Sequence, residues 1–158
     1  MVVLTRPSFH AVCVRGVTIF LATLAVLQFS CIRIRPVYSD KEQAIAEKAV
    51  VGFHDLHNQK RFDEIYNLLD EGPRANTPMS EILETMQQTF GNVGRVESST
   101  LRTASVIPNP IPGYSSQVSL SYDTKFERGE RIENFIWNIK QGEPRLFEYR
   151  IVLSHTDN

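Results

Sequence analysis

The first 39 residues of the chain contain no acidic side chain, and this feature constrains the rest of the sequence most. Four of the 17 basic residues precede Ser39, whereas all 18 acidic residues follow it, so the leader carries a charge of +4 and the remainder −5. Segments that enter or cross a membrane avoid carboxylates and carry basic flanks. Residues 1–38 are therefore predicted to be a signal peptide or a membrane anchor.

Three fates of this leader are compatible with its apolar run, Gly16–Ile32, which is uncharged. A bilayer span needs roughly 20 apolar residues and a signal-peptide core 7–15, so the run lies between the two. It could remain as an anchor helix, be removed after Val37–Ser39, or be cut before a lipidated Cys31. Leu27–Cys31 resembles an imperfect bacterial lipobox, with a bulky Phe29 where small residues are usual. Each fate predicts an extracytoplasmic protein, either membrane-anchored or periplasmic and secreted.

The composition of the chain after the leader indicates what kind of domain the leader carries. Both cysteines, Cys13 and Cys31, lie in the leader, so the domain must be held by its hydrophobic core without a disulfide. Its acidic excess argues against a nucleic-acid partner, because phosphates would repel it. No Asn-x-Ser/Thr sequon occurs, which favours a bacterial envelope.

Residues 39–154 are predicted to form one domain that opens with three amphipathic helices. The first begins at a capping box, Ser39–Glu42, and the second ends near Gly72–Pro73. The third begins at Thr77–Pro78 and ends near Gly91. The apolar stripes of the three helices are Ile45, Ala49, Phe53 and Leu56, then Phe62, Ile65, Tyr66 and Leu69, then Met79, Ile82, Leu83, Met86 and Phe90.

Four strands are predicted after Gly94, with a loop at Pro108–Gly113 and hairpin turns at Glu127–Glu130 and Gln141–Gly142. The expected inward side chains are Val118, Leu120, Tyr122 and Phe126, then Phe135, Trp137 and Ile139, then Phe147, Tyr149, Ile151 and Leu153. Helices followed by hairpin-connected strands indicate an α+β fold, with three helices on one face of a four-stranded antiparallel sheet. Residues 155–158 are predicted to be a frayed tail.

Two stretches resemble a known family. Phe53–Tyr66, with its polar break at Asn58–Lys60, and Phe90–Gly94, which leads into a strand, are similar to nuclear transport factor 2-like domains of the cystatin-like α+β type. Some small bacterial envelope proteins and lipoproteins of unknown function share that pattern. The resemblance covers about residues 40–154 and implies a cone of helices against a curved sheet, often with an apolar pocket. Members include isomerases, dehydratases and binding modules, and no catalytic position carries over to this chain.

The helix stripes and strand alternation also give the candidate site residues. An aromatic set could form core or line an amphipathic pocket; its members are Phe53, Tyr66, Phe90, Tyr122, Trp137 and Tyr149. His54 and His57 could form half a metal site but are interpreted as solvated or capping residues, so no metal or cofactor is expected. The carboxylates near the first hairpin are interpreted as a solvated turn: Asp123, Glu127, Glu130 and Glu133.

These features predict a non-catalytic envelope domain, tethered to the membrane or secreted, that binds a small apolar ligand or a protein partner. The strand Ile132–Asn138 shows a second, mixed face that could form a homodimer or partner surface. One alternative is an enzyme of the ketosteroid isomerase or dehydratase type, with Asp70 or His54 as acid–base group and Tyr66 as hydrogen-bond donor. Another is a structural or assembly component of the envelope.

Overall fold

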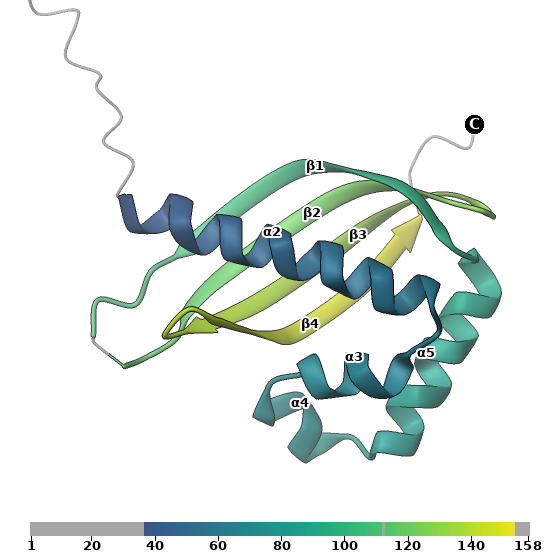
Figure 1. The fold of residues 1–158 in the computed structure, drawn as a ribbon, viewed down its shortest axis with the longest axis horizontal. Coiled ribbons are helices and arrows are strands. Elements are labelled where there is room, and N and C mark those ends of the chain that lie inside the picture. Colours follow the sequence, from purple (N-terminus) through teal and green to yellow (C-terminus); the bar gives the residue numbers. More distant parts are fainter. Residues whose placement is uncertain (1–36, 112, 154–158) are drawn as a thin grey trace, which may run out of the picture. The chain divides into compact units, whose positions relative to one another are not determined.

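A computed structural model describes residues 37–111 and 113–153, which belong to one compact unit, Pro36–Asn158. The three predicted fates of the leader and the predicted C-terminal tail lie outside these residues. Within these residues, four helices precede the strands (Figure 1): α2 (Val37–Asn58), α3 (Phe62–Leu68), α4 (Glu71–Asn76) and α5 (Met79–Val93). Four strands follow: β1 (Val96–Ile107), β2 (Ser116–Phe126), β3 (Gly129–Lys140) and β4 (Glu143–Leu153). No helix in the described ranges is long and apolar enough to span a membrane.

The strands form one sheet in the order β1-β2-β3-β4, each antiparallel to the next. The two predicted hairpin turns are confirmed, at Glu127–Arg128 and at Gln141–Gly142. Gln141 and Gly142 both have positive φ angles, 55° and 86°, as a two-residue turn of type I′ requires. The α+β class, with helices before an antiparallel meander, is confirmed.

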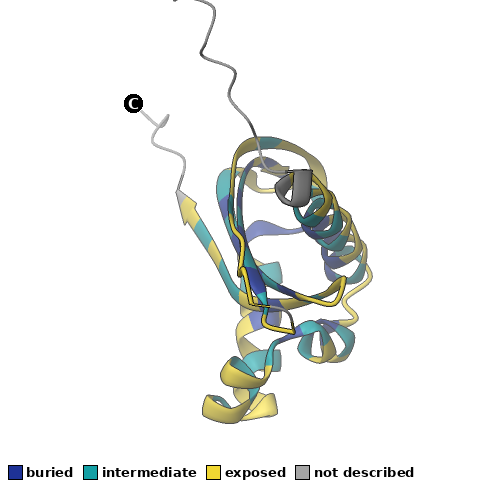
Figure 2. Cartoon of the chain, turned by 90° about the vertical axis from the view of Figure 1, so that its left-hand side faces the viewer, coloured by how far each residue is buried: buried dark blue, intermediate teal, exposed yellow. Residues whose placement is uncertain are grey.

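Helix α2 lies along one face of the sheet, which we call the inner face (Figures 1 and 2). The core lies between this helix, α3 and the strands. Its buried apolar side chains are Ala46, Val50, Phe53, Phe62, Ile65, Leu69, Met86, Val118, Leu120, Tyr122, Phe135, Trp137, Ile139 and Leu146. No described helix covers the opposite, outer face (Figure 2), where Asn134 and Ile136 of β3 are half-buried.

The helices differ from the prediction in number and in one boundary. Gly72–Pro73 does not end a helix but lies in the first turn of α4, where a proline needs no amide partner. Asp70 caps α4 by accepting a hydrogen bond from the Glu71 amide at 2.8 Å. Helix α5 continues past Gly91 and ends at Gly94, whose φ of 79° suits a glycine.

Strand β4 contains a β-bulge that the alternation of its side chains did not reveal. Leu146 pairs with Trp137 and Glu148 pairs with Ile136, so Phe147 is the extra residue. Phe147 is 42% exposed and Leu146 fully buried, which makes the prediction of an inward Phe147 wrong. The Leu146 carbonyl accepts a hydrogen bond from the Asp70 amide at 2.8 Å, which ties the bulge to the start of α4.

Candidate functional site

Four polar side chains from four elements meet on the inner face, and we call them the buried network. Glu133 of β3 is fully buried, and its two carboxylate oxygens accept three hydrogen bonds. His54 Nε2 of α2 donates to Oε2 at 2.9 Å, and Thr124 Oγ1 of β2 donates to the same oxygen at 2.5 Å. The Tyr149 hydroxyl of β4 donates to Oε1 at 2.7 Å. The network therefore connects α2 to three strands.

Burial and hydrogen bonding act in opposite directions on the Glu133 carboxyl. Burial raises its pKa. The hydrogen bond and charge of His54, together with the hydrogen bonds from Thr124 and Tyr149, lower the pKa by more than burial raises it. The pKa of Glu133 therefore lies below its usual value, and the group is a carboxylate at neutral pH. Burial raises the pKa of Tyr149 well above its ordinary value and that of nearby Tyr122 to about 12, so both keep their protons.

Two sequence interpretations are corrected here. Glu133 does not belong to a solvated turn, and neither His54 (8% exposed) nor His57 (1%) is solvated. The signal was present in the spacing, since Glu133 shares strand parity with Phe135 and Trp137. On α2 the two histidines continue the buried stripe set by Ala46, Val50 and Phe53. A stripe defined by its apolar residues alone leaves out His54, His57 and Glu133.

His57 differs from His54 because neither of its ring nitrogens has a hydrogen-bond partner among the described residues. Its neighbour Asn58 uses its side-chain amide on the backbone of Val96, at 2.8 and 3.0 Å. Aromatic rings surround the imidazole, with Phe53 stacked at 6.4 Å and Phe90 tilted at 5.2 Å between centroids. Burial lowers the pKa of His57, so the ring is neutral when buried.

The predicted aromatic set divides into two groups. The first surrounds Phe135: Phe53 lies 5.3 Å from it, Tyr149 5.0 Å, Tyr122 6.1 Å and Trp137 6.4 Å between ring centroids. Phe90 packs instead beside His57 and Phe62. Tyr66 is half-buried against the core. These rings contact one another, which is the arrangement of packed core.

The alternative catalytic residues are not brought together. His54 bonds to Glu133, which points to the inner face of β3. Asp70 instead accepts a hydrogen bond from Asn138, on the outer face of the same strand, at 2.5 Å. The hydrogen bonds of Asp70 and His54 thus lie on opposite faces of the sheet, and the two residues do not form one acid–base site with Tyr66.

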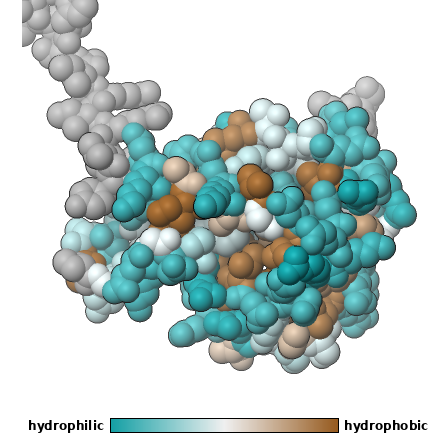
Figure 3. Space-filling model, viewed as in Figure 1, coloured by the Kyte–Doolittle hydropathy of each residue, from teal (hydrophilic) through white to brown (hydrophobic). Residues whose placement is uncertain are grey.

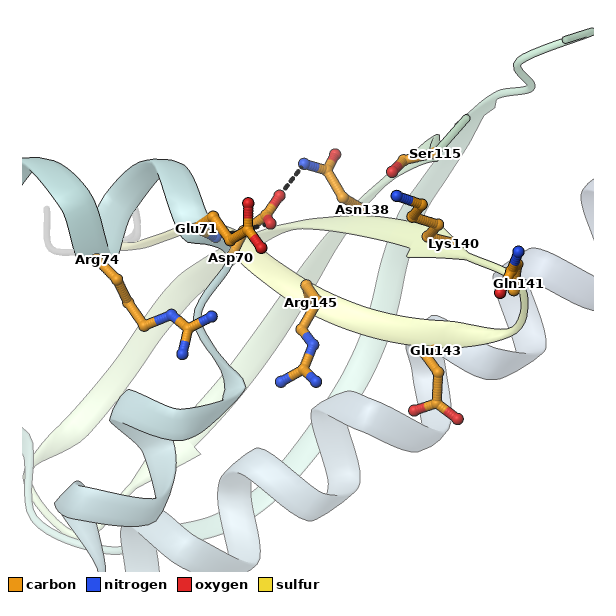
Figure 4. Close-up of a pocket in the computed structure, with 9 residues that line it drawn as sticks. All are labelled: Asp70, Glu71, Arg74, Ser115, Asn138, Lys140, Gln141, Glu143 and Arg145. Carbon is orange, nitrogen blue, oxygen red and sulfur yellow. Dashed lines mark hydrogen bonds between the residues drawn. The ribbon is translucent and has the colours of Figure 1, made fainter. Parts of the chain in front are cut away.

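A surface cleft of about 460 Å³ lies where the β3–β4 hairpin meets α4 (Figure 4). Its lining residues are Asp70, Glu71, Arg74, Ser115, Asn138, Lys140, Gln141, Glu143 and Arg145. We call it the hairpin cleft. Asp70, bonded to Asn138, joins α4 to the sheet, and Arg145 Nη1 donates to the Asn67 carbonyl at 2.9 Å. A second open cleft, about 540 Å³, adjoins it through Ser115 and Asn138 and extends along the β1–β2 loop.

The charged groups of the hairpin cleft are unpaired. Six of its lining residues are charged, three of each sign, and none forms an ion pair in the described part of the chain. Ion pairs do form elsewhere on the surface, such as Lys125 with Glu97 at 2.7 Å. Arg74 Nε is buried and has no hydrogen-bond partner among the described residues. Sequence reasoning missed this cleft because α4 was not predicted.

Comparison with models of known protein families finds no match to this chain, and comparison with curated proteins finds none either. Within residues 37–111 and 113–153, no group of three His, Cys, Asp or Glu side chains is placed to hold a metal ion.

Proposed function

We propose that this protein is an extracytoplasmic, membrane-tethered binding domain, and that it binds a protein partner in the hairpin cleft. The observation that carries the proposal is the set of six charged side chains around the cleft, none of which forms an ion pair with another described residue. Charges of both signs suit the mixed surface of another protein, whereas an apolar small molecule would leave them unpaired.

The buried network supports binding over catalysis. A general base must reach a proton on the substrate, directly or through one water. Both oxygens of Glu133 are already occupied by donors from His54, Thr124 and Tyr149, and both described clefts lie elsewhere on the surface. The network is better explained as a structural connection between helix and sheet.

The extracytoplasmic address rests on the sequence, through the acid-free leader and its apolar run Gly16–Ile32. The nuclear transport factor 2-like resemblance agrees with a long helix packed along a four-stranded antiparallel sheet, and it enters this proposal as support for a binding scaffold. A second copy of the chain is one partner that such a cleft could take.

Photo-crosslinking in the cells that make the protein tests the proposal. A photoreactive residue at the exposed Gln141, on the cleft rim, should give a discrete crosslinked species. The same photoreactive residue at exposed Ser99, near the start of β1 and far from the β3–β4 hairpin, should give no crosslinked species. Lys140→Glu should reduce the yield about tenfold, as expected for one charged contact reversed at an interface. Lys48→Glu, an equal charge change on α2, should leave the yield unchanged.

The mass of the crosslinked species then identifies the class of partner. Twice the mass of the chain would show a homodimer, and any other protein mass a distinct partner. Equal crosslinking from both positions, or none from Gln141, would contradict the proposal. Retention of an apolar small molecule in native mass spectrometry would instead favour the small-ligand hypothesis.

A further inference from the structure

We propose that the β1–β2 loop contacts the lipid bilayer surface through Ile107, Ile111 and Tyr114. This inference rests on the membrane tether in the proposed function and adds a second contact between protein and membrane. It is carried by three observations: the exposure of these side chains, the absence of charged residues from the sequence around them, and their position at the end of the domain where the leader is attached.

Three large side chains are exposed here, one at the end of β1 and two in the loop that follows it. Ile107 is 62% exposed, Ile111 56% and Tyr114 65%. Hydrogen bonds within the loop hold its tip, from the Ile111 amide to Asn109 Oδ1 at 3.1 Å and from the Tyr114 amide to the Ile111 carbonyl at 3.2 Å. The isoleucine and the tyrosine at the tip are therefore presented together.

The sequence around the loop carries no charge. No Asp, Glu, Lys or Arg occurs in the 20 residues from Thr103 to Tyr122, although 22% of the chain is charged. Part of this run lies in β1 and β2, but the connecting loop, residues 108–115, is also free of charge, whereas protein surfaces usually carry charge for solubility. An isoleucine and a tyrosine on an uncharged tip match the composition of segments that enter the headgroup region, where tyrosine is enriched.

The loop lies at the same end of the domain as the first turn of α2. Asn58, the last residue of α2, is bonded to Val96, the first residue of β1. Helix α2 therefore starts towards the other end of the sheet, where Ile107 pairs with Gln117 and the loop begins. In Figure 1 both lie at the left. Figure 3 shows apolar atoms at this loop end, at the lower left.

The length of chain before α2 limits how far this end can lie from a bilayer. Only five residue steps separate Ile32, the end of the apolar run, from Val37, the first residue of α2. At about 3.6 Å per extended residue this is at most ~18 Å. A lipidated Cys31 would add one more step. A tethered domain therefore keeps its loop end near the headgroups, and the neighbouring hairpin cleft would meet its partner there.

Quenching by brominated lipids tests this contact with the full chain in vesicles of phosphatidylethanolamine and phosphatidylglycerol doped with brominated phosphatidylcholine. Vesicle flotation first reports the tether. Tyr114→Trp should then make about half of the tryptophan emission quenchable, since one of its two indoles would lie in lipid. Trp137 is fully buried and contributes the other half. Ser99→Trp, at the other end of β1, should add emission that the lipid does not quench.

The outcomes separate the two proposals. Flotation with quenching only at position 114 supports the lipid contact, and Ile111→Asp should then reduce that quenching. Flotation with no quenching at position 114, or with equal quenching at 114 and 99, overturns the contact and leaves the tether intact. A chain that does not float contradicts the tether, and the lipid contact falls with it.

Discussion

The buried network and the hairpin cleft both contain charged and polar side chains, but their surroundings give them different properties. In the network, Glu133 is fully buried and all of its oxygens have donors. In the cleft, Lys140, Glu143 and Arg145 stand in solvent without ion pairs among the described residues. A paired, buried group stabilises one structure, whereas an unpaired group near the surface is available to a partner.

A cluster of titratable residues is therefore not by itself a reactive site. His54 and Glu133 have the residue types of an acid–base pair, and their separation of 2.9 Å is suitable for proton transfer. Their hydrogen bonds are nevertheless directed at one another and at Thr124 and Tyr149. We therefore expect substitutions in the buried network to have large effects on stability and substitutions in the hairpin cleft to have small ones.

The largest effect is expected from Glu133→Ala. The substitution leaves buried donors on His54, Thr124 and Tyr149 without their acceptor and should lower the free energy of unfolding by about 3–5 kcal/mol. Urea unfolding of the full chain in mild detergent, followed by Trp137 fluorescence, measures it. Glu143→Ala, the matched change in the cleft, should change the free energy by less than ~0.5 kcal/mol. Similar losses in both variants would break the distinction.

A smaller effect is expected from Tyr149→Phe, which removes one hydroxyl and keeps the ring. Glu133 Oε1 would lose the one side-chain donor found for it, at a cost of about 1–3 kcal/mol. Tyr114→Phe is the control, since that hydroxyl belongs to a 65% exposed side chain and its loss should be nearly neutral. A neutral Tyr149→Phe would show that the hydrogen bond contributes little.

His57 sharpens the comparison through pH. Burial holds its folded pKa below the ordinary value of 6.5, so the unfolded chain takes up the proton first. Its contribution to stability is therefore present above about pH 6.5 and is lost on further acidification. Glu133, whose folded pKa lies below 4.5, loses its contribution in a separate, more acidic range. Between about pH 7.5 and 5.5, His57→Leu should show a flatter decline in stability than the parent chain. An identical loss of stability in the two proteins would show that His57 does not cause the pH dependence.

The smallest stability effect is expected in the cleft itself. Lys140→Glu should alter the free energy of unfolding by less than ~0.5 kcal/mol, because the side chain is exposed and has no ion-pair partner among the described residues. The same urea titration measures it, with Lys48→Glu as the control for charge. A loss above 1 kcal/mol would indicate that Lys140 is part of the fold.

The fold class could be predicted from the sequence because each element has a strong local signal. Gln141–Gly142 forms the turn that its residue types favour, and β3 alternates as Phe135, Trp137 and Ile139 require. The bulge at Phe147 could not be predicted, because it depends on the distant Asp70 amide bonding to the Leu146 carbonyl. The spacing places His54 and Glu133 among buried residues, but their hydrogen-bond partners lie on other elements, and no single strand or helix displays them.

We propose that the buried network stabilises the domain, whereas the hairpin cleft binds a protein partner. Crosslinking yield from Gln141, per folded molecule, in the Tyr149→Phe and Lys140→Glu variants tests it most directly. We expect Tyr149→Phe to lower the unfolding midpoint and keep the crosslinking yield, and Lys140→Glu to keep the midpoint and lose the yield. A Tyr149→Phe protein that remains folded but no longer crosslinks, beside a Lys140→Glu protein that crosslinks normally, would contradict it.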